Sequence, residues 1–163
     1  MTVKACSELP NEALEKILSA YQLKLKVTQN NTEIPGSFWG ETEAGLIGNT
    51  LYIQNTTPVH SALHEACHFI CMDNTRRQTL DTNAGGDYDE ENAVCYLQLL
   101  LSEHISGYSQ AQHMRDMDNW GYSFRLGSAK RWFLEDAEDA KQWLCNKKLI
   151  NSEGKPQWRL RDT

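Results

Sequence analysis

The sequence lacks any long uninterrupted run of apolar residues. A helix that spans a membrane needs about 20 consecutive apolar residues, whereas the longest apolar stretch, residues 93–101, is already interrupted by Gln98. The first ten residues also lack the apolar segment of a secretory signal peptide. We therefore expect no membrane partner and a cytoplasmic location.

An excess of positive charge is also missing. The 163 residues include 16 Lys and Arg against 22 Asp and Glu, a net charge of −6, and both halves of the chain are acidic. A protein that follows nucleic-acid phosphates needs a basic surface, so we expect no nucleic-acid partner. Apolar residues make up 40% and charged residues 23% of the chain, which is typical of a globular domain.

Paired cysteine motifs are absent as well. The five cysteines are an odd number and include no CxxC pair, whereas a secreted disulfide scaffold uses a dense, even set. The count indicates reduced thiols in a reducing compartment. We expect Cys67, Cys71 and Cys95 to pack as small apolar groups between helices rather than to bind metal; the other two cysteines are Cys6 and Cys145.

Hydrophobic periodicity predicts a helix, then a small sheet, then further helices. The expected elements are a helix over 11–21, strands over 23–27, 38–40, 44–47 and 51–53, and helices over 58–72, from about 87–91 to 104, over 110–119 and over 128–145. Residues 73–88 are expected to form a loop, and 146–163 a polar, solvated tail. This order predicts an α+β fold, a single domain over 1–163 with its core in 10–101, a helical C-terminal extension over 102–145, and a small antiparallel or mixed sheet.

The segment that carries chemistry is His64-Glu65-Ala66-Cys67-His68, an HExxH motif inside the predicted helix 58–72. Two histidines four residues apart lie within about 40° of each other on one helical face, so their imidazoles can bind one metal ion. Glu65 lies about 100° around the helix and can reach a water on that ion without being a ligand. The motif predicts a metal site.

Two histidines do not complete a catalytic zinc site, which needs a third protein ligand and an open position. The residues after His68 are Phe-Ile-Cys-Met-Asp, and neither His104 nor His113 has the HExxHxxGxxH spacing. A third histidine ligand is therefore excluded, and a carboxylate is the better candidate.

Acidic residues begin the next apolar helix: Asp87, Asp89, Glu90 and Glu91. Glu90 is favoured because Ala93, three residues later, allows close helix packing and because Leu97 shares its face. Glu91 shares a face with Cys95 and is the second candidate, and the two aspartates remain open. The carboxylates that do not bind metal are expected to complement the helix dipole.

Two segments resemble a known family. VHSALHEACHFI at 59–70, followed by EENAVCYLQLL at 90–100, is similar to the pattern of the gluzincin zinc peptidases, and LYIQN at 51–55 is similar to the compact ImmA/IrrE-type members. The resemblance covers about residues 10–101. It implies His64, His68 and Glu90 as zinc ligands and Glu65 as the catalytic base. Val94 departs from the pattern, since many gluzincins have an Asp or Asn there to orient a zinc-bound histidine.

The resemblance implies a Zn²⁺-dependent peptidase that acts on a peptide or protein substrate. Its tetrahedral intermediate needs an electrophile besides the metal, and Tyr122 and Arg125 in the segment WGYSFRLG at 120–127 are the candidates that we favour, with His104 and His113 as further ones. The alternative is a regulatory or protein-interaction module of the same fold whose metal is not catalytic. The sequence does not indicate an oligomeric state.

Overall fold

The described part of the chain folds into a small mixed sheet and seven α-helices, as the α+β expectation requires. The computed structural model describes residues 3–29, 32–37 and 43–162. The strand expected over 38–40 lies outside these residues. Helix α1 (Ala13–Ala20) and strand β1 (Lys24–Val27) confirm the first two expected elements.

Within the described residues, the sheet consists of three strands in the order β1-β3-β2. Strands β2 (Gly45–Ile47) and β3 (Thr50–Ile53) form the expected hairpin, with Gly48 at φ +57°, a conformation that favours glycine. β3 then pairs with β1 in parallel, so that Leu25 lies beside Leu51. Leu46 in the edge strand β2 also bonds outside the sheet: its N–H donates to Gly36 O and its carbonyl accepts from Thr82 N.

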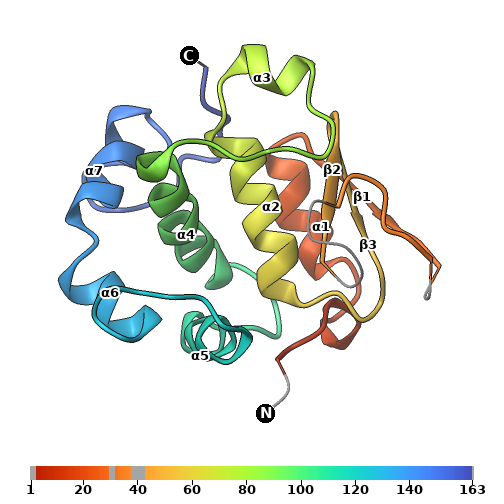
Figure 1. Cartoon of the computed structure of the whole chain (residues 1–163), viewed down its shortest axis with the longest axis horizontal. Coiled ribbons are helices and arrows are strands. Elements are labelled where there is room, and N and C mark those ends of the chain that lie inside the picture. Colours follow the sequence, from red (N-terminus) through yellow and green to blue (C-terminus); the bar gives the residue numbers. More distant parts are fainter. Residues whose placement is uncertain (1–2, 30–31, 38–42, 163) are drawn as a thin grey trace.

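Helix α2 (Val59–Cys71) lies in the middle of the molecule, between the sheet on one side and helix α4 on the other (Figure 1). It begins one residue later than expected, with Pro58 in an extended conformation as its N-cap. Twelve of its thirteen residues are buried, because α1, the sheet and α4 surround it. The HExxH motif therefore lies on the central helix of the core.

Helix α4 (Tyr88–Ser102) packs against α2 along its length. Its first turn is capped by the Asp87 side chain, which accepts from the backbone N–H of Glu90 at 2.9 Å. Helix α5 (Gln110–Trp120) follows as expected. No helix in the described part of the chain is long and apolar enough to cross a membrane.

Three expectations about the remaining segments are wrong. The region expected to be a loop contains a short helix, α3 (Asn74–Gln78), which Asp73 caps. The helix expected over 128–145 is two helices, α6 (Ala129–Glu135) and α7 (Glu138–Asn146), that separate at Asp136 and Ala137. The C-terminal tail is not simply solvated, because Arg161 N donates to Ile70 O at 3.1 Å, at the end of α2.

Candidate metal centre

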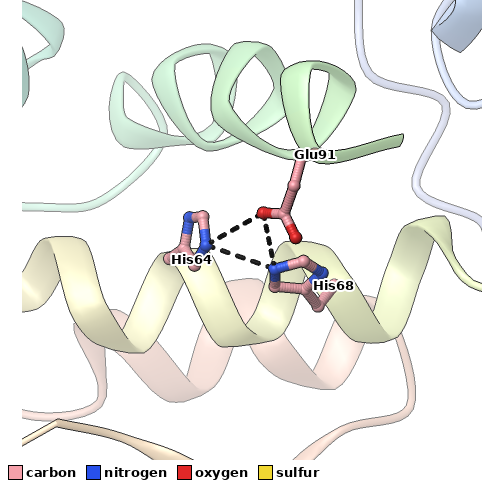
Figure 2. Close-up of side chains that lie close together, drawn as sticks. All are labelled: His64, His68 and Glu91. Carbon is pink, nitrogen blue, oxygen red and sulfur yellow. Dashed lines mark hydrogen bonds and ion pairs between the residues drawn. The ribbon is translucent and has the colours of Figure 1, made fainter. Parts of the chain in front are cut away.

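The two histidines of the HExxH motif lie side by side on α2 and face α4 (Figure 2). Their Nε2 atoms are 3.2 Å apart, and their rings meet edge to face with centroids 4.7 Å apart. One carboxylate oxygen of Glu91, on α4, lies 3.1 Å from His68 Nε2 and 3.6 Å from His64 Nε2. Three potential ligand atoms from two helices thus converge on one point.

The structure brings Glu91, not Glu90, to the histidines, and our order of preference between them is reversed. Glu90 is buried, but its Oε1 lies 2.6 Å from Arg76 Nη2 and 3.0 Å from Arg161 Nη1. Adjacent residues project about 100° apart on a helix, so only one of the two glutamates can face α2. Of the aspartates, Asp87 caps the helix and Asp89 is exposed.

Gln98 is a residue of the site that the sequence analysis did not identify. Its Oε1 lies 2.7 Å from His64 Nδ1, on the ring edge opposite the Nε2 that faces Glu91. A hydrogen bond at Nδ1 leaves Nε2 free to bind a metal, which is the usual function of such a partner. Gln98 is therefore placed to orient His64, whereas Val94, a fully buried apolar residue, has no side-chain group that could hydrogen-bond to a histidine.

The sequence does contain a signal for Gln98. It lies seven residues after Glu91, which is about two helical turns, so the two side chains share a face of α4. Gln98 is fully buried within an otherwise apolar run, and a buried polar group needs a hydrogen-bonding partner. The signal in the sequence is therefore a polar residue, Gln98, that interrupts an apolar stretch seven residues after the candidate ligand Glu91.

A cavity of about 200 Å³ opens beside the three ligand groups. It is lined by both histidines, Glu65 and Glu91, and on the other side by Thr82, Asn83, Ala84 and Gly85. Burial raises the pKa of Glu65 above its ordinary value, although His64 and His68 oppose this effect. Partial burial also favours protonation of Glu91, but its hydrogen bonds to the two imidazoles outweigh burial and lower its pKa. Glu91 is therefore held as an anion, the form that binds a cation.

Of the candidates for an additional electrophile, Tyr122 packs beside the histidines, although it is not among the residues that line the cavity. Its ring centroid lies 5.8 Å from that of His64, and its hydroxyl lies 3.2 Å from His60 Nδ1. Arg125 is not among the residues that line the cavity; its side chain is 77% exposed and pairs with Asp136. The expectation for Arg125 therefore finds no support in the geometry.

The two other histidine candidates also lie elsewhere. His104 is exposed and packs its ring against Trp158 with a centroid separation of 5.0 Å. His113 is fully buried and bonds to Gln98 rather than lining the cavity. Neither side chain is therefore placed to contact a substrate in the cavity.

No cysteine belongs to the group of potential metal ligands found among the described residues. Cys67 and Cys71 are fully buried, and burial raises the pKa of both thiols, which keeps them protonated. Among the residues that the structure describes, His64, His68 and Glu91 are the single group of three potential ligands close enough to share an ion. Two imidazoles and a carboxylate are a ligand set that catalytic zinc uses.

The spacing of the three ligand atoms fits zinc as well. Zn²⁺ binds nitrogen and oxygen at about 2.0–2.1 Å in a tetrahedral arrangement, which places ligand atoms about 3.3 Å from one another. The observed separations are 3.1, 3.2 and 3.6 Å. A shared metal ion therefore requires little rearrangement of these side chains.

Comparison of the chain with models of protein families, with curated proteins and with solved structures gives no match.

Proposed function

We propose that this protein is a zinc-dependent peptidase whose metal is bound by His64, His68 and Glu91. The observation that carries the proposal is the convergence of these three side chains beside Glu65, at a cavity that all four line. Three protein ligands leave a fourth position open, as catalysis by zinc requires. The substrate class that we propose is a peptide or a protein.

Zinc in such a site lowers the pKa of a water molecule toward about 7 and polarises a carbonyl group. Glu65 takes the proton from the attacking water and passes it to the leaving amine. Its raised pKa brings this carboxyl closer to neutral pH, which suits a group that must both accept and release a proton. Tyr122 packs beside His64 but does not line the cavity, so donating a hydrogen bond to the developing oxyanion would require its hydroxyl to move away from His60.

We also propose a reducing compartment such as the cytoplasm as the place of action. All five cysteines are free, although Cys67 and Cys71 are one helical turn apart. Proteins in oxidising compartments more commonly use their cysteines in disulfides.

A second function, a metal-binding module without catalysis, is favoured by a different observation. The cavity is only about 200 Å³, and ligand pockets are usually about 300–1,000 Å³. Both backbone polar groups of Leu46 on the edge strand β2 are already bonded to Gly36 and Thr82, so an extended peptide cannot pair there without displacing them.

The metal site is tested by measuring zinc content with elemental mass spectrometry. We expect about one zinc per chain in wild type and in Glu90→Gln, and none retained in Glu91→Ala. Glu90→Gln is the neighbouring control, since it changes an adjacent acid that faces Arg76 and Arg161. Wild type without zinc, or loss of zinc from Glu90→Gln alone, would contradict the proposal.

The two functions are separated by cleavage of a peptide library. We expect wild type to hydrolyse peptides, whereas Glu65→Gln keeps its zinc and loses this activity by at least about 100-fold, because general acid–base catalysis contributes about 10²–10⁴-fold. Equal cleavage by both proteins would contradict the role of Glu65. Zinc binding by wild type without any cleavage would support the non-catalytic module.

A further inference from the structure

A continuous row of buried polar side chains leads from His64 into the interior between α4 and α5. Gln98 Nε2 lies 2.8 Å from His113 Nε2, and His113 Nδ1 lies 3.1 Å from the Tyr108 hydroxyl. That hydroxyl lies 3.1 Å from Asp116 Oδ2. Three of these side chains, those of Gln98, His113 and Asp116, belong to fully buried residues. We call Gln98, His113, Tyr108 and Asp116 the Asp116 chain.

The direction of each hydrogen bond follows from the buried carboxylate. Asp116 accepts from Lys4 N at 3.1 Å and from Gln112 Nε2 at 2.7 Å, so it is placed as an acceptor. Tyr108 then donates its proton to Asp116, and its oxygen accepts from His113 Nδ1–H. The carboxylate of Asp116 thereby determines which atom donates and which accepts in each of these hydrogen bonds.

The direction of these hydrogen bonds extends through His113 to the proposed metal centre. Burial lowers its pKa well below the ordinary value, with His60 and His64 contributing, so the ring is neutral and carries one proton. With that proton on Nδ1, the bare Nε2 accepts from Gln98 Nε2–H. Gln98 Oε1 is then left to accept from His64 Nδ1–H.

We propose that the Asp116 chain is a positioning device that fixes the tautomer and the orientation of His64, so that its Nε2 presents a lone pair to the metal. This inference rests on the proposed metal site. The opposite orientation of the Gln98 amide would place its NH₂ group against His64 Nδ1 and move the ring proton to Nε2, which then could not bind a metal. A buried polar network is costly unless every member is satisfied, and this network ends on a ligand.

The two proposed ligand histidines differ in whether their Nδ1 atom has a hydrogen-bonding partner. His68 Nδ1 is buried and has no hydrogen-bonding partner among the described residues. Its ring is therefore held by packing within α2 and by Glu91, whereas His64 is held from both edges. Disturbing the Asp116 chain should consequently act on zinc through His64 alone.

The test is the zinc affinity of purified full-length variants, measured by competition with a chromophoric chelator. Gln98→Leu removes the acceptor and is expected to weaken zinc binding by about 10–100-fold. Gln98→Glu still offers an oxygen to the same Nδ1 proton but no N–H to His113 Nε2, so its zinc affinity is expected to lie between those of wild type and Gln98→Leu. The matched control is Gln110→Leu, because Gln110 Nε2 bonds to Leu99 O and not to the Asp116 chain. Its zinc affinity should equal that of wild type.

A second readout is the protonation of the ring nitrogens, observed by ¹⁵N NMR of histidine. We expect His113 in the Nδ1–H form in wild type, and His64 in the same form when zinc is added. Should Gln98→Leu fail to fold, Tyr108→Phe serves as the second variant. It removes one hydroxyl from the Asp116 chain and is also expected to lower the zinc affinity.

The outcomes distinguish this inference from the function on which it rests. Wild type that binds no zinc contradicts the metal site itself and with it the positioning role. Wild type that binds zinc, together with a folded Gln98→Leu or Tyr108→Phe variant of equal affinity, overturns the positioning role alone. His113 in the Nε2–H form also overturns it, since the order of donors would then be reversed.

Discussion

His60 is a buried histidine on α2, four residues before His64, and it does not line the cavity. It is fully buried, its ring packs 5.1 Å from that of Trp120, and its Nδ1 bonds to the Tyr122 hydroxyl. Burial, with a further contribution from His64, lowers the pKa of His60 to about 3. The folded protein therefore holds this imidazole neutral at pH values where the unfolded chain protonates it.

This difference predicts how stability depends on pH. Because the pKa of His60 is lower in the folded state than its ordinary 6.5, its contribution is complete above pH 6.5 and is lost as the pH falls toward 3. Each proton taken up only by the unfolded chain gives a slope of about 1.4 kcal/mol per pH unit. We expect His60→Gln to reduce the pH dependence of the unfolding free energy between pH 6 and 4 by about 1.4 kcal/mol per pH unit, which is the contribution of one proton.

The measurement is urea unfolding of wild type and His60→Gln at several pH values, with a metal chelator present so that zinc release does not contribute. The comparison uses slopes, since the variant can differ in absolute stability. Parallel curves for the two proteins would show that His60 does not titrate differently in the folded state.

At the scale of elements, the start of α4 determines where Glu91 lies. Asp87 caps this helix by accepting from Glu90 N, and Glu91 belongs to the same first turn. Asp87→Ala is expected to lower the free energy of unfolding by about 1 kcal/mol, as loss of an N-cap usually does. It is also expected to lower the zinc affinity, because the first turn of α4, which carries Glu91, frays. Asp89→Ala is the control, since Asp89 is exposed and contributes mainly to the helix dipole.

Thermal unfolding and zinc titration of both variants test this role. We expect Asp89→Ala to stay close to wild type in zinc affinity while Asp87→Ala falls below it. Equal losses in the two variants would mean that charge near the helix N-terminus, and not the cap, positions Glu91.

Periodicity in the sequence was sufficient for most elements but not for the rotation of α4. Helices α1, α2 and α5 and the β2–β3 hairpin match their expected positions because each has a clear apolar face or turn signal. Helix α4 is buried on most sides, so its apolar pattern does not specify which glutamate faces α2. Glu90 instead pairs with Arg76 and with Arg161, the latter 71 residues away, and the apolar pattern of α4 contains neither partner.

The other failures have a similar cause. Helix α3 is short and polar, and no residue in it is buried, so hydrophobic periodicity cannot detect it. The apolar pattern continues through Asp136 and Ala137, but the chain separates into α6 and α7 there. Asp136 pairs with Arg125, eleven residues earlier, which is a tertiary contact that the helical period does not report.

At the scale of the whole molecule, the C-terminal segment holds the ends of α2 and α4 together. Arg161 donates to Glu90 Oε1 and to Cys71 O, both at 3.0 Å, and its guanidinium stacks 5.3 Å from the centre of the Trp143 ring on α7. Arg77 in turn donates to Arg161 O at 2.6 Å. One arginine thus joins three helices, and together with Arg76 it pairs with Glu90, on the side away from the metal centre.

Arg161→Ala is therefore expected to destabilise the protein by about 3 kcal/mol, because removal of one partner from a largely buried ion pair leaves a buried charge less compensated. Arg159→Ala is the matched control: its side chain is 45% exposed and pairs with the exposed Asp162, so its loss should cost less than about 1 kcal/mol. Urea unfolding of both variants measures the difference, and equal costs would contradict the anchoring role. Zinc content should remain one per chain in both, because Arg76 still holds Glu90 at 2.6 Å and Glu91 is unaffected.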